Sequence, residues 1–443
     1  MIRASSKSRE RDVRETDFEV GEEYALRLDE DDPLAPFRDR FYPIPGVIYM
    51  DGNSLGLLSR DAEGTLLRVL EEWRRLGVKG WSQGQIPWIW YGERLGALMA
   101  PLVGAEPDEV VVAGSTTVNL HTLVATFYRP EGERRKILAD ELNFPSDIYA
   151  LAAQIRLRGG DLDEDLVLVR SGDGRTVDEG DVIDAMSEEV ALALLPSVYY
   201  RSGQLLDMER LTEEAHRRGI PIGFDCSHSV GVVPHRLDDW GVDFAFWCNY
   251  KYMNGGPGST AGLYVNRRHF GARPGLAGGW GPDRATQFDM ALSFTPAKSA
   301  GAWQIGTISM LSSAPIEGAT RLMLEAGIGR IREKSLKMTG YLMFLVDELL
   351  SGPPYGFSLG TPREPERRGG HVAVEHPTEA FRVMEALKAR GVIPDFRPPN
   401  IIRLAPVPLY TSYRDVWRVV QHLKGIIDDR EYERFPRERG VVT

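Results

Sequence analysis

Cysteine is nearly absent from this chain of 443 residues, which holds only Cys226 and Cys248. Each lies in an apolar run, so we expect two buried small side chains and neither a disulfide framework nor a cysteine-rich metal cluster. Long apolar runs are also missing, and none approaches a membrane span. Residues 1–21 are charged throughout and lack the apolar core of a secretory signal. Together these absences fit a reducing compartment and predict a cytoplasmic location.

Positive charge is in deficit. The chain carries 53 Lys and Arg against 64 Asp and Glu, a formal net charge of −11. This balance argues against non-specific binding to nucleic acid or to an anionic membrane, while leaving room for a local basic pocket. The hydrophobic content of 42% and the charged content of 26% are those of an ordinary globular protein. We therefore expect no nucleic-acid or membrane partner.

Short apolar runs alternate with helical patterns through the middle of the chain. This alternation is typical of βαβ units and predicts an α/β fold with a mostly parallel seven-stranded sheet, covered by helices on both faces. In such sheets, ligands bind beyond the carboxyl ends of the strands. The seven expected strands are 110–113, 136–139, 166–169, 190–195, 220–224, 244–247 and 263–265.

Lys251 and Asp225 carry the strongest chemical signal. Each follows an apolar strand, and a lysine at the end of a buried strand is costly unless it is paired or functional. A lysine and an acid on neighbouring strands can hold pyridoxal phosphate, the lysine through a Schiff base and the acid by keeping the ring nitrogen protonated. The alternatives are a lysine that reaches solvent and an aspartate that caps a helix.

Other polar residues follow the expected strands at the same edge. Gly114 to Thr117 lie between a strand and a helix, where hydroxyl and N–H groups either bind phosphate or cap the helix. Phe144 could stack on a flat ring and Asp147 could accept from a phenolic oxygen; equally, they could be a core aromatic and a helix cap. Ser197 could reach a phosphate. His228 could orient Asp225, face the cofactor, or be structural.

Four segments are expected along the chain. Residues 1–20 form a charged arm, and residues 21–105 contribute to a small domain and to the entrance of the site. Residues 106–315 form the large cofactor-binding domain. Residues 316–443 comprise one long helix over 316–350, ended by Pro353-Pro354, and a small α+β domain.

Seven motifs stand out along the chain: Gly52-Asn53-Ser54-Leu55-Gly56-Leu57, Thr117-Val118-Asn119-Leu120-His121, Phe144-Pro145-Ser146-Asp147, Phe224-Asp225 with His228, Trp240 to Ala245, Tyr250-Lys251-Tyr252, and Arg403 with Ala405 to Tyr410. Taken together, these motifs resemble those of the kynureninase family over about Tyr49 to Ile427. The resemblance implies the aspartate aminotransferase fold, type I, and pyridoxal phosphate as cofactor.

The resemblance also implies roles for individual residues. Lys251 would be the Schiff-base lysine and proton carrier, Asp225 would hold the pyridinium and Phe144 would stack on the ring. Arg403 would clamp the substrate carboxylate, as the fork of arginine suits. The other implied cofactor contacts are Thr116, Thr117, Ser197, His228 and Tyr250, with Tyr250 also acting as an acid. Trp280 and Thr307 would reach the cofactor phosphate across a homodimer interface, and Ser54 and Trp81 would lie at the substrate's aromatic end.

The implied reaction is hydrolysis of the Cβ–Cγ bond of L-kynurenine, or of 3-hydroxykynurenine, to an anthranilate and L-alanine in tryptophan catabolism and NAD biosynthesis. The chain departs from the family pattern at Gly281-Pro282-Asp283 and at Ile308-Ser309, whereas Thr307 and Trp81 favour unsubstituted kynurenine. The alternatives are a hydrolase of a ring-substituted kynurenine in secondary metabolism, an aminotransferase or desulfurase of the same fold, and a non-catalytic cofactor-binding protein.

Overall fold

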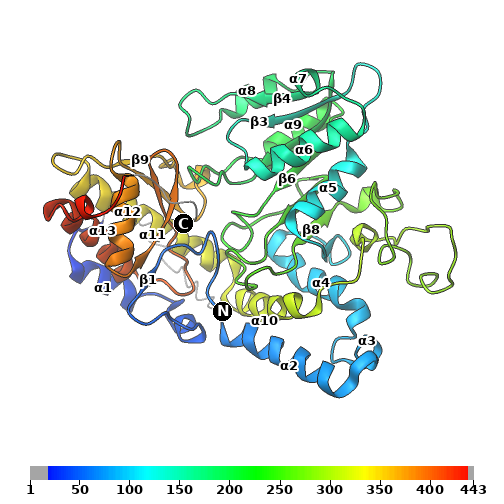
Figure 1. The fold of residues 1–443 in the computed structure, drawn as a ribbon, viewed down its shortest axis with the longest axis horizontal. Coiled ribbons are helices and arrows are strands. Elements are labelled where there is room, and N and C mark those ends of the chain that lie inside the picture. The colour runs from blue at the N-terminus through cyan, green and yellow to red at the C-terminus, as the bar shows by residue number, and fades with distance from the viewer. Residues whose placement is uncertain (1–17, 438–443) are drawn as a thin grey trace, which may run out of the picture.

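Seven strands form the central sheet of a computed structural model that describes residues 18–437 (Figure 1). Their order is β2-β8-β7-β6-β5-β3-β4, and only β8 runs antiparallel to its neighbours. The mostly parallel seven-stranded sheet predicted from the sequence is thus confirmed. The strands are β2 (Val110–Val112), β3 (Lys136–Asp140), β4 (Leu166–Val169), β5 (Val190–Pro196), β6 (Ile222–Asp225), β7 (Phe244–Trp247) and β8 (Gly262–Val265).

A second, smaller sheet lies on the other side of the molecule, to the left in Figure 1. It is antiparallel, in the order β12-β13-β10-β9. Segments from both ends of the chain share its apolar core, because Ala25, Leu28 and Ile48 pack with the C-terminal helices. The elements here are α1 (Glu22–Glu30), β1 (Ile48–Tyr49), α11 (Ile328–Leu350), β9 (Ser358–Leu359), β10 (Val372–Glu375), α12 (Ala380–Ala389), β11 (Val392–Ile393), β12 (Asp395–Arg397), β13 (Ile401–Leu404) and α13 (Tyr413–Asp428).

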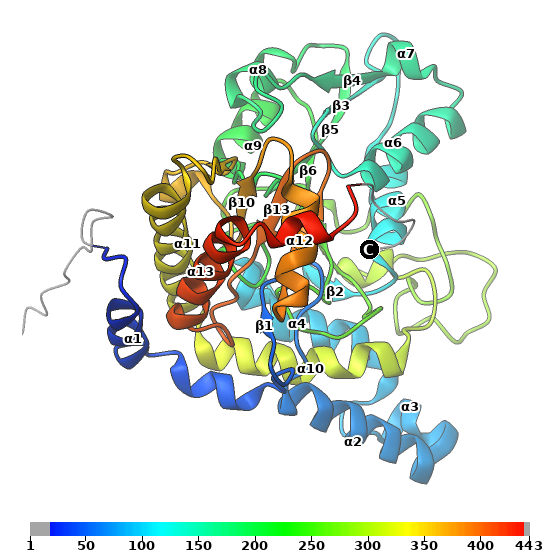
Figure 2. The same cartoon turned by 60° about the vertical axis from the view of Figure 1, so that its left-hand side comes forward.

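The single long helix predicted over 316–350 is wrong, because two helices occupy this region. α10 (Met310–Ala326) ends at Gly327, which has a φ of 80°, and α11 begins directly after it. A glycine adopts this positive φ at the end of a helix without the steric cost that a side chain would add. α10 then lies along α2 (Arg60–Leu76), as both Figure 1 and Figure 2 show.

Of the charged arm predicted over 1–20, residues 1–17 lie outside the described residues.

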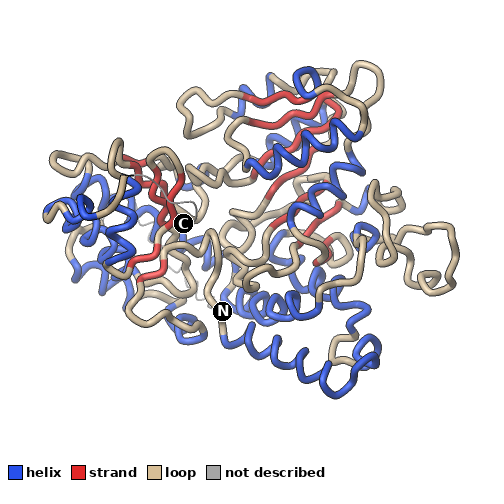
Figure 3. Tube along the Cα trace, viewed as in Figure 1, coloured by secondary structure: helices blue, strands red, loops and turns tan. Residues whose placement is uncertain are grey.

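A long segment between β8 and α10 contains mostly loop, drawn in tan in Figure 3. It carries Trp280 and the exposed side chains of Phe288, Met290 and Leu292. The remaining short helical turns of the described chain are η2 (Ala35–Arg40), η3 (Gly77–Lys79), α3 (Gly80–Gln83), η4 (Trp88–Trp90), α7 (Leu162–Asp165), η5 (Arg267–His269), η6 (Ala300–Trp303), η7 (Pro365–Arg367) and η8 (Glu431–Arg434).

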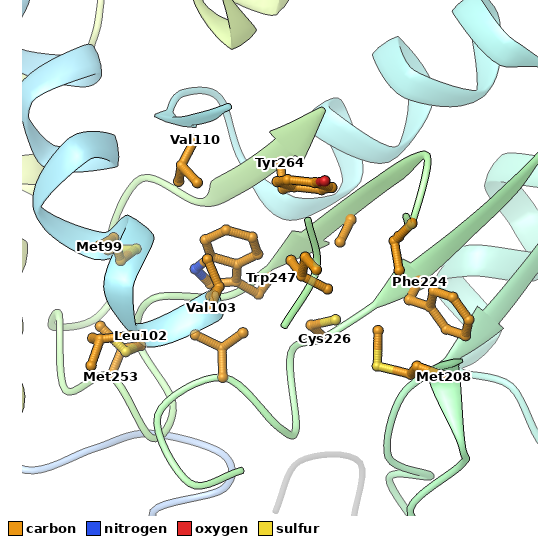
Figure 4. Close-up of a cluster of buried hydrophobic side chains, with 14 of the residues drawn as sticks. Met99, Leu102, Val103, Val110, Met208, Phe224, Cys226, Trp247, Met253 and Tyr264 are labelled. Carbon is orange, nitrogen blue, oxygen red and sulfur yellow. The ribbon is translucent and has the colours of Figure 1, made fainter. Parts of the chain in front are cut away.

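Helices cover both faces of the large sheet because alternate side chains of each strand point to opposite faces. Val111 packs with α5 (Thr116–Phe127) and α6 (Pro145–Leu157) on one face. Val110 packs on the other face, with α4 (Tyr91–Val103), α8 (Glu179–Asp184) and α9 (Met208–Arg217). Figure 4 shows this second core, in which Met99 and Val103 of α4 lie near Trp247. Two packed faces make the sheet a rigid base for the residues at its edge.

The turn over 51–57 joins the small sheet to the loop that carries Lys251. At one end, the Ala405 N–H donates to the Met50 carbonyl at 2.8 Å; at the other, the Gly56 N–H donates to the Tyr250 carbonyl at 2.7 Å. A Cβ on Gly56 would lie 2.5 Å from the Lys251 carbonyl oxygen, so only glycine permits this approach. Within residues 18–437, no helix combines the length and apolar character needed to cross a membrane.

Candidate active site

A cavity lies between the two sheets, with a volume of about 680 Å³ that includes the space open to solvent at its mouth. The carboxyl ends of β6 and β7 and the first turns of α5 and α6 form one wall; β12 and β13 form another. The structure brings together most of the residues predicted for the site. Those that line the cavity are Ser54, Thr116, Thr117, Phe144, Asp147, Asp225, His228, Tyr250, Lys251 and Arg403.

Lys251 lies at the centre of the wall formed by the large sheet. Its Nζ is 3.0 Å from Nε2 of His228 and 6.0 Å from the centroid of the Phe144 ring. Burial, and then the charge of Lys251, hold the pKa of His228 well below its usual range. His228 is therefore neutral, and its Nε2 can accept a hydrogen bond from the amine. This contact fixes the position of Nζ beside an aromatic face.

Asp147 and Asp225 form a buried carboxyl pair on the same wall, 4% and 8% exposed. Burial first, and then the charge of Asp225 and a hydrogen bond to it, raise the pKa of Asp147 well above its usual range. Asp147 thus holds a proton, as expected for two carboxyls that cannot both ionise at close range. The Ser227 N–H donates to Oδ1 of Asp225 at 2.8 Å. Asp225 lines the cavity, with this N–H on its carboxylate.

Hydroxyl groups gather where α5 begins. Oγ1 of Thr117 lies 3.2 Å from Oγ of Ser146, and Oγ1 of Thr116 lies 3.0 Å from Sγ of Cys248. The N-terminus of a twelve-residue helix adds unpaired N–H groups and a partial positive charge, which favour an anion. Burial, and then Cys248, raise the pKa of the Tyr250 hydroxyl, which therefore stays protonated at neutral pH.

Arg403 dominates the opposite wall. It lies on β13, is 1% exposed, and donates from Nη1 to the Tyr200 carbonyl at 2.6 Å and from Nη2 to Ser54 Oγ at 3.2 Å. It is also paired with Asp395. Nε of Arg403 has no hydrogen-bond partner among the described residues. A buried guanidinium with spare donors is suited to bind a carboxylate.

Four residues of the predicted site lie outside the cavity lining. Ser197 is fully buried, and both its N–H and its hydroxyl donate to the carbonyl of Asp225, at 2.8 and 3.0 Å. It therefore fixes the end of β6 from the end of the neighbouring strand β5. Trp81 and Trp280 pack on each other with ring centroids 5.6 Å apart, and Thr307 is exposed.

Six lining residues were not predicted as site residues: Asn53, Ser146, Tyr200, Ser227, Cys248 and Arg397. Asn53, Ser146 and Ser227 stood inside or beside the recognised motifs, so proximity to those motifs was a usable signal. Cys248 is buried, as expected for both cysteines, yet it reaches the cavity. Tyr200 and Arg397 carried no signal, because their position depends on how a loop and the small sheet meet.

The wall around Lys251 fits pyridoxal phosphate. It offers an amine for the aldehyde, an ionised carboxylate for a protonated ring nitrogen, an aromatic face for the ring, and hydroxyl and helix N–H groups for the phosphate. A cationic partner is favoured because Asp225 is 8% exposed and a buried carboxylate is costly without a counter-charge. Residues 18–437 hold no group of three or more His, Cys, Asp or Glu placed to bind a metal.

Comparisons with known proteins agree with this geometry. The family model for the kynureninase C-terminal domain matches residues 331–423. A kynureninase of Geobacillus thermodenitrificans is 58% identical over 431 residues, covering 97% of this chain and all of that protein. Kynureninases of Bacillus cereus and Shouchella clausii are 56% and 55% identical, covering 96% and 95% of this chain and 99% and 98% of those proteins.

Solved structures show the same fold at low sequence identity. A cysteine desulfurase from Thermococcus onnurineus superposes with a TM-score of 0.74 at 17% identity, covering 91% of this chain and 98% of its own. A variant of the cystine C–S lyase C-DES, with glycine covalently linked to its PLP cofactor, gives 0.73 at 15%, covering 87% and 98%. The near full-length identity to the curated relatives decides the classification, and the chain belongs to the kynureninase family.

Proposed function

We propose that this protein uses pyridoxal phosphate to hydrolyse the Cβ–Cγ bond of L-kynurenine, giving anthranilate and L-alanine. The observation that carries the proposal is one cavity that holds Lys251 and Asp225 on one wall and Arg403 on the other. The relatives named kynureninase, at 55–58% identity over nearly the whole chain, support it. When bound, the cofactor supplies an electron sink that makes the substrate Cα–H acidic and the Cβ–Cγ bond labile.

The residues of the large-sheet wall would hold the cofactor. Lys251 would bond its aldehyde carbon, Asp225 would accept from the ring N–H, and Phe144 would cover the ring face. Thr116 and Thr117 would donate to the phosphate at the start of α5, while Ser197 would support Asp225 through its carbonyl.

Proton transfers fall to two side chains. The amine of Lys251 would take the proton from the substrate Cα, and neutral His228 at 3.0 Å would keep Nζ in place while it does so. The Tyr250 hydroxyl would give a proton as water adds to the aryl ketone, a role that its raised pKa suits at neutral pH. Arg403 would orient the substrate through its carboxylate, and Ser54 lies beside it.

The test is turnover of L-kynurenine by the cofactor-loaded protein in the absence of any keto acid. We expect anthranilate, followed by its fluorescence, and L-alanine in equal amounts. Amino transfer that requires a keto acid would indicate an aminotransferase instead. Running 3-hydroxykynurenine and ring-substituted kynurenines in parallel tests the preference for the unsubstituted ring and the effect of the Gly281-Pro282-Asp283 departure.

We further propose a two-fold homodimer in which Trp280 and Thr307 complete the neighbour's site. The same long loop exposes the apolar side chains of Phe288, Met290 and Leu292. These side chains support a dimer interface, because a partner subunit would bury them. Mixing Lys251→Ala with Trp280→Ala subunits tests this. Shared sites would restore about a quarter of the wild-type activity, since half the dimers would be hybrids with one intact site each. A mixture no more active than the two variants measured separately would contradict sharing.

The cytoplasmic location and the domain boundaries stay predictions.

A further inference from the structure

Two arginines on the small-sheet wall share a single carboxylate. Arg403 on β13 and Arg397 on β12 both line the cavity, and Nη2 of each contacts the same oxygen, Oδ2 of Asp395. The Arg397 contact is 3.1 Å. Oδ1 of Asp395 is held separately by the Phe396 N–H at 2.8 Å. One oxygen of one carboxylate therefore lies between two cations.

The strand register produces this sharing. Asp395 lies directly opposite Arg403 in the antiparallel β12–β13 pair. Arg397 is two residues from Asp395 on the same strand, so the two side chains project to the same face of the sheet. Backbone pairing therefore places the carboxylate of Asp395 within reach of both arginines.

The two arginines differ in burial. Side-chain exposure is 1% for Arg403, 17% for Asp395 and 31% for Arg397. A guanidinium as buried as Arg403 is costly without a counter-charge, and Asp395 supplies one. A resident carboxylate also competes with any ligand carboxylate for the same donors. Arg397, whose guanidinium carbon lies 5.9 Å from the centroid of the Tyr200 ring, remains available to Asp395 when a ligand carboxylate displaces Asp395 from Arg403.

We propose that Asp395 occupies Arg403 as a stand-in for the substrate carboxylate, and that Arg397 retains Asp395 when the substrate displaces it. Arg397 is then a positioning residue that acts through Asp395. The inference rests on the proposed function in one respect, that Arg403 receives the α-carboxylate of an amino acid. Once a ligand carboxylate binds Arg403, Asp395 pairs with Arg397, so each arginine keeps an anionic partner.

Asp51 is the other carboxyl near these arginines, facing them from the 51–57 turn. Burial raises its pKa to about 6, Asp395 adds to the rise, and Ser54, Arg403 and Arg397 oppose it. Among residues 18–437, no hydrogen bond joins it to either arginine, and its Oδ1 is unpartnered. Asp51 therefore influences the charge of the cluster without occupying the donors of Arg403.

The test is a double-mutant cycle on the cofactor-loaded enzyme. L-Alanine is the probe, and its dissociation constant is read from the change in visible absorbance of the lysine-bound cofactor. Arg397→Met should weaken L-alanine binding about tenfold, because Asp395 then stays on Arg403. In an Asp395→Asn background, where the competing anion is absent, the same change should weaken binding less than about twofold. With L-kynurenine, Arg397→Met should raise KM by a larger factor than it lowers kcat.

Two controls keep the cycle interpretable. Arg382→Met removes a similar arginine, paired with Glu379 at 2.9 Å and lying 5.4 Å from the Tyr432 ring, and should leave L-alanine binding unchanged. The unperturbed cofactor absorbance of each variant confirms that the site has folded. Equal weakening by Arg397→Met in both backgrounds would overturn the exchange and make Arg397 a direct ligand contact. No weakening in either background would also overturn it.

The cycle separates this inference from the proposed function. L-Alanine binding needs no carbon–carbon cleavage, so a protein that fails to hydrolyse kynurenine can still show the predicted coupling between Arg397 and Asp395. Conversely, kynurenine hydrolysis with no coupling would leave the proposed function intact and remove the exchange.

Discussion

The two walls of the cavity have opposite arrangements of charge. On the large-sheet wall, two carboxyls, Asp147 and Asp225, lie together and one of them must hold a proton. On the small-sheet wall, two arginines, Arg397 and Arg403, share one carboxylate. One wall thus favours an added cation and the other an added anion. A protonated pyridine ring and an amino acid carboxylate meet these two needs, on opposite sides of one small cavity.

The comparison also explains why the two walls come from separate sheets. The carboxyl pair lies at the carboxyl edge of a mostly parallel sheet packed on both faces, which suits a permanently held group. The arginines lie on an antiparallel pair whose register places Asp395 between them. A shared counter-ion suits a group that binds and leaves in each turnover.

The largest expected effect is on the large-sheet wall. Lys251→Ala should abolish the visible absorbance of lysine-bound cofactor and lower kcat/KM for L-kynurenine at least about 10³-fold, because both attachment and proton transfer are lost. Lys424→Ala, which removes a surface lysine paired with Asp428 at 2.6 Å, is the matched control. Retention of the absorbance band in Lys251→Ala would show that another lysine holds the cofactor.

The carboxyl pair should respond unequally. Asp225→Asn removes the anion and should lower kcat/KM about 100-fold, equivalent to a loss of roughly two pKa units of ring-nitrogen basicity. Asp147→Asn replaces an already neutral acid with a neutral amide, so we expect less than about a fivefold change. Equal losses from the two substitutions, measured by steady-state kinetics, would mean that the proton is not held by Asp147.

On the opposite wall, Arg403→Met should act on binding. Losing charge-assisted hydrogen bonds to a carboxylate, each about 1.5 to 3 kcal/mol, should raise KM for L-kynurenine roughly 10- to 100-fold. The cofactor absorbance should be unaffected, since the large-sheet wall is untouched. A normal KM would remove Arg403 from the substrate site, and loss of cofactor would mean that the walls are not independent.

The smallest effect concerns the pH dependence of the free energy of unfolding, through a histidine pair that joins the two walls. His228 and His371, with ring centroids 5.8 Å apart, are buried, and burial lowers the pKa of His371 to about 3. A histidine with a depressed folded pKa binds fewer protons folded than unfolded, so its contribution falls as pH drops from about 6.5 toward 3. The free energy of unfolding, from urea melts, should fall below pH 6.5, and less steeply in His371→Gln. Identical slopes would contradict this.

Some of this molecule could be predicted from sequence and some could not, for physical reasons. The seven strands were predictable because each is a short, continuous apolar run, and Lys251 and Asp225 stood out because charge at the end of such a run is costly. The break at Gly327 was missed because apolar residues continue through both α10 and α11. A single glycine inside a helical pattern is a weak signal.

The small-sheet wall was only half predictable. Arg403 was assigned through its motif, whereas Arg397 and Asp395 become neighbours of the cavity only through the register of β12 on β13 and the packing of that pair against Tyr200. The pairing register of short strands such as β12 and β13 depends on the turn between them and on tertiary packing. Trp280 and Thr307 were assigned through the family resemblance, and both lie outside the cavity lining.

The most direct test of the two-wall account is a crystal structure of the protein with pyridoxal phosphate and a non-reacting amino acid analogue of the substrate. The account predicts the ring nitrogen within hydrogen-bond distance of Asp225, the analogue carboxylate on Arg403, and Asp395 moved to Arg397. A cofactor ring that turns its nitrogen away from Asp225, or an analogue carboxylate bound elsewhere with Asp395 still on Arg403, would contradict it.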